Sequence, residues 1–229
     1  MRVFSRLAIK YKQEHGKVPV LIVDNANRLA QSLPRLLDRF QDYAKNAADK
    51  GTAAVVFVSS KGRVPRRMME RSSWSRRGEI IEIGDVSKEE ALQYLKLRNI
   101  DKERAAQIYH LVGGRMIHLK FIADKLERNG AFEAIRQMIF YDVNGQLMSA
   151  QVLPAHRYHK EGAVIIRELL KKGSISSNAF YKLVGADTGD KLLEANIFAF
   201  HLNSREITFQ STVMKRFCEE NSALWQGNE

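Results

Sequence analysis

An acid and an amide stand together at the end of an apolar run near the start of the chain. Asp24 and Asn25 follow the residues VLIV at positions 20–23. A short unbroken apolar run of this kind is typical of a strand buried on both faces in a parallel sheet. Because open α/β sheets bind ligands at the carboxyl edge of their strands, this pair is a candidate binding site. The alternative is a polar turn that caps the next helix.

A second apolar run also ends in polar residues, and a basic segment follows it. The run GTAAVVFVSS predicts a buried strand at about 53–59 and ends at Ser59 and Ser60. From residue 61 to residue 77 there are seven basic residues against one acid, more than half of the net charge of +11. One concentrated basic loop, which includes Arg76 and Arg77, favours phosphate contact over a nucleic-acid face spread along the chain. A solvated charged loop is the alternative.

The elements around these residues predict a parallel, three-layer α/β unit. One helix precedes the first strand, and leucines and aromatic residues at helical spacing between positions 29 and 43 predict another after it. The run GEIIEIGD predicts a third strand at about 79–83. Strands that alternate with helices are typical of parallel sheets.

The rest of the chain predicts helices and then a hairpin. Ser87 and Glu90 form a capping-box pattern at the start of a small helical bundle, and residues 131–158 predict a further helix and a connector. The last 70 residues predict three short helices, a β-hairpin in FAFHLNSREITFQ and a closing helix. This order is typical of a winged helix. The expected domains are residues 1–84, 85–158 and 159–229.

Composition excludes several classes of protein. Cys218 is the only cysteine, so an internal disulfide and a cysteine-rich zinc site are excluded. No apolar run approaches the roughly 20 residues that span a bilayer, so we expect no membrane association. An intracellular location is expected, with the cytoplasm favoured; the basic, acid-poor start leaves a mitochondrial location open, and a nuclear one is also open. His156 and His159 lack acidic or cysteine partners, so we expect them on a connector surface.

The order of these motifs resembles a known family. LIVDNANRL, AAVVFVSSKG, SWSRRGEIIEIGDVSKEEALQYL, LVGGRMIHL and a terminal winged helix follow one another as in the archaeal-type ATPase family of the AAA+ and STAND P-loop NTPases. Fungal relatives also carry Asp-Asn where most members carry Asp-Glu. The resemblance implies an α/β fold class with a partial parallel P-loop NTPase sheet and flanking helices. A helical lid and a C-terminal winged-helix domain would follow that sheet.

The resemblance also implies roles for individual residues. Asp24 would be the Walker B acid that holds Mg²⁺ through water, and Asn25 would occupy the place of the glutamate that activates water. An amide can orient water but cannot accept its proton, so we expect no ATP hydrolysis. Ser59 and Ser60 would occupy the sensor 1 position that contacts the γ-phosphate. The resemblance further places Arg76 and Arg77 at an arginine directed to a nucleotide of the same or a neighbouring subunit, and Arg115 at sensor 2.

The chain contains no G-x-x-x-x-G-K-[ST] pattern, which a P-loop needs to cradle phosphates. In the family this motif lies upstream of the Walker B strand, so the sequence predicts either a truncated gene model or a degenerate paralogue. ATP and Mg²⁺ are cofactors of the intact family, and we expect this chain alone to bind neither. The P-loop strand would lie between the strands at 53–59 and 79–83. These two strands should therefore pair directly or leave apolar edges exposed.

Three functions remain open at this point. The first is the sensing half of an ATP-dependent switch, which is inactive alone and is completed by a missing N-terminal half or by self-association. The second is a nucleic-acid-binding winged-helix protein with a vestigial ATPase body. Residues 187–196 carry a net charge of −2 where a DNA-reading helix would be basic, so nucleic acid is not favoured. The third is a protein-interaction module for an attached effector domain.

Overall fold

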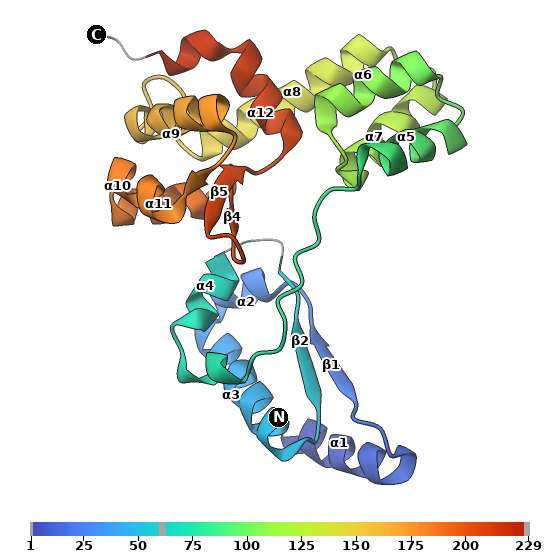
Figure 1. Ribbon diagram of the computed structural model, residues 1–229, viewed down its shortest axis with the longest axis vertical. Coiled ribbons are helices and arrows are strands. Elements are labelled where there is room, and N and C mark those ends of the chain that lie inside the picture. The colour runs from blue at the N-terminus through green and yellow to red at the C-terminus, as the bar shows by residue number, and fades with distance from the viewer. Residues whose placement is uncertain (1, 60–62, 227–229) are drawn as a thin grey trace. The chain divides into compact units, whose positions relative to one another are not determined.

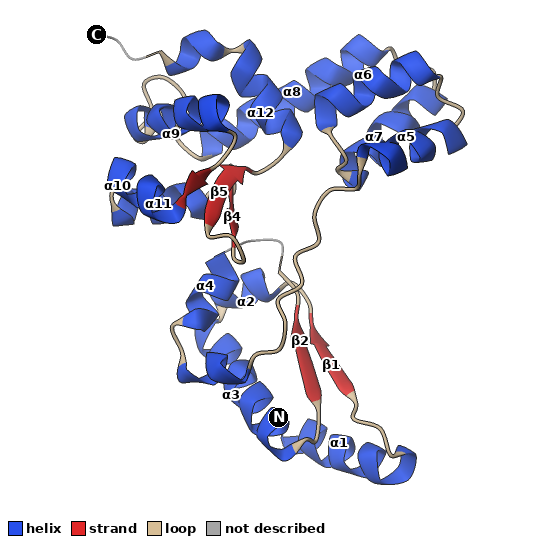
Figure 2. Ribbon diagram, viewed as in Figure 1, coloured by secondary structure: helices blue, strands red, loops and turns tan. Residues whose placement is uncertain are grey.

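The computed structural model describes residues 2–59 and 63–226, and the chain divides into two compact units, residues 1–80 and residues 81–229 (Figure 1). The fold is mixed α/β and mostly helical. The described residues form twelve α-helices, one two-stranded parallel sheet and one three-stranded antiparallel sheet (Figure 2). None of the helices in the described ranges has the length and apolar character needed to cross a bilayer.

The first unit is built on two parallel strands. Strand β1 (Val20–Val23) pairs with β2 (Ala54–Phe57) in a register that places Val20 beside Ala54 and Val23 beside Phe57. The crossover between them contains the helices α2 (Ala26–Ser32) and α3 (Pro34–Lys50). The two strands predicted at 20–23 and 53–59 are therefore confirmed.

Helix α1 (Arg2–His15) precedes the sheet and packs through small residues. Ala8 is buried against Ala47 and Ala53, and the ring of Phe4 meets that of Tyr43 edge to face with 5.7 Å between centroids. Alanine side chains let the backbones of α1 and α3 approach closely but bury little apolar surface. The contact between α1 and the rest of the unit therefore contributes little stabilisation.

The helix expected across residues 29–43 is interrupted. Helix α2 ends at Ser32 and α3 begins at Pro34, with Leu33 between them at φ −138°. Proline has no N–H and clashes with the carbonyl four residues earlier, so it starts a helix readily but does not continue one.

The segment expected as a basic loop is largely helical. Helix α4 (Arg63–Met69) and the 3₁₀ helix η1 (Ser72–Arg76) lie within it. Val64 and Met68 are buried with Leu37, and Trp74 packs against the same cluster. These apolar side chains anchor the segment to α3. The segment is therefore folded against the unit, although its run of basic residues predicted a loop.

The predicted third strand is wrong. Residues 78–87 have no regular secondary structure, and Ile81 and Ile83 are 80% and 91% exposed. A β-branched run becomes a strand only where a neighbouring edge satisfies its backbone groups. Here β2 is hydrogen-bonded to β1, and no described strand lies on its other edge. The outer edge of β2 is therefore unpaired among the described strands, and residues 79–83 do not pair with it.

The second unit begins with four helices. Ser87 and Glu90 form the predicted capping box, in which Ser87 Oγ accepts from the Glu90 amide at 3.2 Å and Glu90 Oε2 accepts from the Ser87 amide at 2.8 Å. Asp101 caps the next helix by accepting from the Arg104 amide at 2.9 Å. The helices are α5 (Lys88–Leu97), α6 (Lys102–Val112), α7 (Met116–Glu127) and α8 (Phe132–Ser149).

The C-terminal part of this unit combines helices with a small sheet. The predicted hairpin is formed by β4 (Phe198–His201) and β5 (Glu206–Phe209), and β5 also pairs with β3 (Ile175–Ser176), so that the strand order is β3-β5-β4. Helices α9, α10 and α11 precede the hairpin and α12 follows it. Their bounds are α9 (His159–Lys172), α10 (Ser177–Val184), α11 (Ala186–Glu194) and α12 (Thr212–Glu220).

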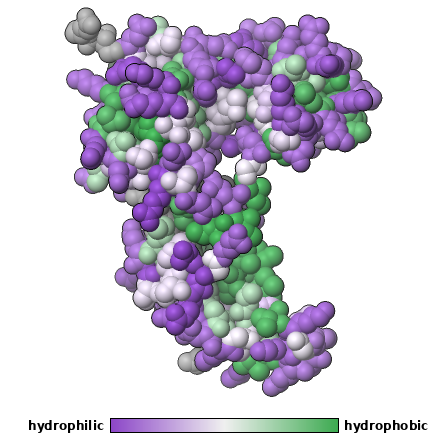
Figure 3. Space-filling view, in the orientation of Figure 1, coloured by the Kyte–Doolittle hydropathy of each residue, from purple (hydrophilic) through white to green (hydrophobic). Residues whose placement is uncertain are grey.

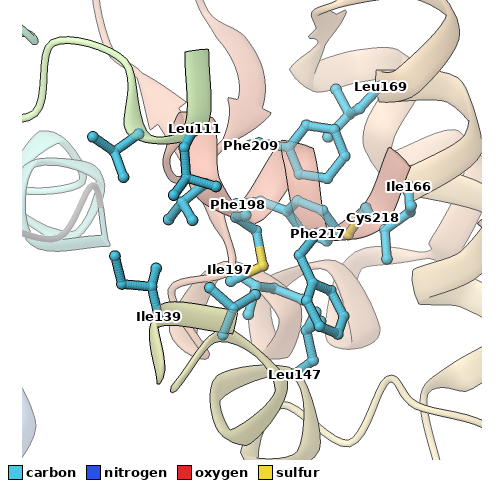
Figure 4. Close-up of a cluster of buried hydrophobic side chains, with 14 of the residues drawn as sticks. Leu111, Ile139, Leu147, Ile166, Leu169, Ile197, Phe198, Phe209, Phe217 and Cys218 are labelled. Carbon is cyan, nitrogen blue, oxygen red and sulfur yellow. The ribbon is translucent and has the colours of Figure 1, made fainter. Parts of the chain in front are cut away.

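One continuous apolar core joins the elements of the second unit. Phe217 and Cys218 of α12 lie among side chains of α8, α9 and the hairpin (Figure 4). The fully buried tryptophan Trp225 closes the core at its C-terminal end and donates its indole N–H to the Cys218 carbonyl at 3.1 Å. Burial here is far more extensive than in the first unit.

Candidate functional site

Asp24 and Asn25 form a compact exposed turn at the carboxyl end of β1. The Asn25 amide N–H donates to Asp24 Oδ1 at 2.7 Å, and its side-chain Nδ2 donates to Asp24 Oδ2 at 3.2 Å. Asn25 has a φ of 52° and precedes the first residue of α2. Asparagine tolerates this left-handed conformation better than other non-glycine residues. Asn25 therefore fixes the carboxylate of Asp24 from both sides.

The parallel pairing of the strands brings Ser59 to the same edge of the sheet. The Val58 amide donates to the Val23 carbonyl and the Ala26 amide donates to the Val58 carbonyl, each at 2.9 Å. The chain that leaves β2 is thus hydrogen-bonded to both sides of the Asp24–Asn25 turn, and Ser59 follows directly. Ser60, the other expected sensor residue, lies outside the described residues.

Arg76 and Arg77 are held elsewhere in the first unit. Arg76 Nε donates to Asp49 Oδ1 at 2.6 Å, and Asp49 lies in the last turn of α3, which leads into the amino end of β2. The guanidinium of Arg77 lies 5.1 Å from the centroid of the Trp74 ring. Asp24, by contrast, follows the carboxyl end of β1, so the structure does not bring Arg76 to the Asp24 turn.

Other arginines of the basic segment are also neutralised by α3. Arg67 contacts Asp38 at 3.2 Å, and Arg71 contacts Asp42 at 2.7 Å and Asp38 at 3.6 Å. Hydrogen bonding to Asp42 raises the pKa of Arg71. This acidic stripe was not predicted, although Asp38, Asp42 and Asp49 recur in the sequence at spacings that share one helix face.

Arg115 lies in the second unit, at the start of α7. Its Nε donates to Asp85 Oδ1 at 3.1 Å. The backbone is tied at the same place, because the Val86 amide donates to the Gly114 carbonyl at 3.0 Å and a Cβ at Gly114 would lie 1.9 Å from the Val86 carbonyl oxygen. Burial, with the charge of Arg115, lowers the pKa of His118. Arg115 thus fixes the residues that precede α5 to the start of α7.

The remaining candidate residues are structural. The ring N–H groups of His159 and His156 face the carbonyls of Val152 at 2.8 Å and Pro154 at 3.2 Å, which shapes the connector before α9. Burial raises the pKa of the Cys218 thiol, so the thiolate that reacts and binds metals is disfavoured. In the described parts of the chain, no three His, Cys, Asp or Glu residues gather as a metal site.

The Asp24 turn and Ser59 offer a limited chemistry. A carboxylate has about four lone-pair positions, and Asn25 uses two of those on Asp24. The others are open to water molecules of a hydrated cation. The Asn25 amide can orient a water molecule but cannot take its proton. The chain matches no protein-family model and no curated protein.

Proposed function

We propose that this chain is the C-terminal part of an AAA+/STAND-type ATPase, a nucleotide-dependent switch that is inactive without a phosphate-cradling segment. The observation that carries the proposal is the shared strand edge: the Asp24–Asn25 turn ends β1 and is hydrogen-bonded to the chain that carries Ser59 out of β2. Ligand sites of parallel sheets lie at this edge. Asp24 would hold hydrated Mg²⁺ and Ser59 would contact the terminal phosphate.

The C-terminal half supports the same family. The C-terminal elements are a helix, a short strand, two helices, a hairpin and a closing helix, with strand order β3-β5-β4, and this order is compatible with the proposed winged helix. The helices α5 to α8 that precede it would form the lid. Arg115 at the start of α7 would take the sensor 2 role if nucleotide released it from Asp85.

The arginines of the basic segment would not act on the nucleotide of their own chain. Arg76 is paired at the amino end of β2, away from the Asp24 turn of its own chain. Arg76 and Arg77 would therefore act on the nucleotide of a neighbouring subunit, which the family resemblance allows. This role depends on self-association.

A nucleic-acid-binding function is less well supported. In the proposed winged helix, α11 would be the recognition helix, and it exposes Asp187 and Asp190. Tyr181 donates its hydroxyl to Asp190 at 2.8 Å, and the one lysine, Lys191, contacts Glu194 at 3.4 Å. This acidic surface would repel phosphates.

The first test is phosphate release by the purified chain with ATP and Mg²⁺. We expect the rate to equal that of a buffer blank, because no described segment supplies a phosphate cradle and Asn25 cannot act as a base. Steady hydrolysis that disappears in Asp24→Ala would overturn the proposal, since the chain would then carry a complete site.

The second test is the coding sequence immediately upstream of Met1. We expect an in-frame strand followed by G-x-x-x-x-G-K-[ST]. An upstream sequence that lacks this motif would contradict the proposed ATPase and would identify the chain as a remodelled protein.

A further inference from the structure

Helix α8 carries apolar residues on two opposite sides. One side contributes four residues to the core of the second unit, namely Ile135, Ile139, Val143 and Leu147. On the other side Met138 is 45% exposed, Tyr141 79% and Met148 54%. With 3.6 residues per turn, each residue is rotated by 100° from the last, so these three lie on the side of the helix opposite the four core residues. The fold of the second unit therefore leaves one apolar side of α8 uncovered.

This surface differs from the apolar surface over β1 and β2, which the space-filling view shows in the first unit (Figure 3). The strand and helix that carry the phosphate cradle in the proposed ATPase would cover that face of the sheet, because parallel sheets occur almost only with both faces covered. The proposed function assigns no such occupant to α8.

The exposed side of α8 has the spacing of a coiled-coil seam. The exposed stripe is defined here as Ala134, Met138, Tyr141, Gly145 and Met148. These residues recur at alternating intervals of four and three, the heptad spacing by which helices pack in pairs. The stripe is flanked by Gln137 and Asn144 on one side and by Asp142 and Ser149 on the other, so Asp142 is the one charge beside it. Depletion of charge is typical of the centre of an interface.

The sizes of the residues along the exposed stripe fit a second copy of the same helix. When two copies of α8 lie antiparallel, with a two-fold axis beside Val143, Tyr141 of each copy lies opposite Gly145 of the other, and Met138 lies opposite Met148. A Cβ added at Gly145 would meet nothing within 4 Å, so the space above this glycine is open to an aromatic ring. Large residues then face small ones, as interdigitating layers require. A parallel pair would instead place tyrosine against tyrosine and leave a gap between two glycines.

We propose that the exposed stripe of α8 is a self-association surface, through which two copies of the chain form an antiparallel, two-fold symmetric dimer. Such a contact uses the same surface on both partners, which is the arrangement of most homodimers. Each tyrosine ring would lie over the glycine of the other copy. The 18 residues of α8 are about 27 Å long at 1.5 Å per residue, so the contact is small and the dimer is weak and concentration-dependent. It requires no nucleotide and is independent of the proposed ATPase.

The positive charge of the chain lies away from this contact. Residues 61–77 carry more than half of the net +11, whereas residues 137–151 contain Asp142 as their one charged residue. Exposed charges more than about 8 Å apart are largely screened at physiological ionic strength. Asp142 lies one residue from the proposed axis, so the two Asp142 carboxylates would approach each other and oppose the dimer. Self-association should therefore strengthen as salt is added, whereas nucleic acid or an anionic membrane would bind this basic chain more weakly.

The first test is sedimentation velocity of the purified chain over a range of concentrations, at low and high salt and without nucleotide. Tyr141→Ser removes the ring, and Gly145→Leu fills the space opposite it while adding apolar surface and favouring the helix. Leu97→Ser is the control at a 75% exposed apolar position of α5. We expect a dimer that tightens with salt. Tyr141→Ser and Gly145→Leu should each weaken it at least tenfold, Asp142→Asn should tighten it, and Leu97→Ser should leave it unchanged.

The second test is cross-linking with a short bis-maleimide. The native Cys218 is buried with a raised pKa, so the unaltered chain gives the background. Asn144→Cys lies one residue from the axis, so the two thiols would lie about 3 Å apart along the helices. Gln137→Cys, on the same flank and six residues from the axis, would place its thiols about 18 Å apart. We expect Asn144→Cys to cross-link and Gln137→Cys to remain at background.

Several results would overturn the proposal. A chain that stays monomeric at every concentration has no self-association surface on α8. A dimer that survives Tyr141→Ser is formed by another surface. A dimer that Gly145→Leu strengthens depends on apolar surface alone and not on the fit of tyrosine over glycine. Equal cross-linking of Asn144→Cys and Gln137→Cys would show a parallel pair.

Discussion

Asn25 lies in the turn between β1 and α2 with a φ of 52°. The destabilisation of the first unit should therefore depend on how well the residue that replaces Asn25 tolerates this left-handed conformation. A left-handed residue other than glycine, asparagine or aspartate costs about 1–2 kcal/mol. Asn25→Ala should therefore destabilise residues 1–80 by about that amount. Asn25→Gly relieves the backbone but loses about 0.5–1 kcal/mol to the greater freedom of the unfolded chain, so its net effect should be smaller.

Asn25→Glu tests the same turn with the residue that most members of the resembled family carry. The backbone cost equals that of alanine, and repulsion from the adjacent Asp24 adds a small amount because both residues are exposed. With an m value of about 1 kcal/mol per molar urea, Asn25→Ala and Asn25→Glu should lower the unfolding midpoint by about 1–2 M. The turn geometry would then explain why an asparagine is favoured here in this chain.

The two tryptophans of the chain allow a specific assay. Trp74 packs against the cluster of the first unit, and Trp225 is buried in the second. Urea unfolding followed by fluorescence in a Trp225→Phe background therefore reports on residues 1–80. If Asn25→Ala and Asn25→Gly unfold at the same urea concentration, the left-handed turn does not constrain the position and this reasoning is wrong.

Three further outcomes are expected from the packing and charges. Gly114→Ala should destabilise the second unit by about 1–3 kcal/mol, because its Cβ would overlap a backbone carbonyl. Gly145→Ala should stabilise the unit by up to about 1 kcal/mol, because the added Cβ meets nothing within 4 Å inside α8. Urea unfolding compares the two variants. Hydrogen bonds from Lys120 and Arg98 lower the pKa of Asp124 from 3.8 to about 2, so its contribution is present above pH 3.8 and is lost as the pH falls toward 2. Asp124→Asn should flatten the acid dependence of unfolding in that window, and an unchanged slope would exclude the network as its cause. Amide hydrogen exchange should be faster in the strands of the first unit than in the core of the second, and equally slow exchange would show that the two-stranded sheet is complete as it stands.

Local patterns predicted much of this structure. The strand before Asp24, the strand before Ser59, the capping box at Ser87 and the hairpin all depend on residues near one another in the sequence. The parallel order of the two strands followed from the helical residues between them. That order places Asp24 and Ser59 at one edge of the sheet.

Long-range contacts account for the errors. Residues 79–83 have the composition of a strand, but no described strand offers them an edge. Arg71 and Arg76 appeared available for phosphate because their partners, Asp42 and Asp49, lie 29 and 27 residues earlier. These ion pairs form only because α3 lies beside the basic segment in the fold. The charge of the segment alone does not predict that arrangement.

The central claim is that Asp24 serves a magnesium nucleotide when the phosphate-cradling segment is present. The most direct measurement is the affinity of the upstream-extended chain for ATP with and without Mg²⁺, compared between the unaltered sequence, Asp24→Ala and the exposed acid control Asp187→Ala. We expect Mg²⁺ to tighten ATP binding. Asp24→Ala should reduce this Mg²⁺-dependent gain in affinity at least tenfold, and Asp187→Ala should leave it unchanged. An Mg²⁺-dependent gain that is equal in all three proteins would contradict the account.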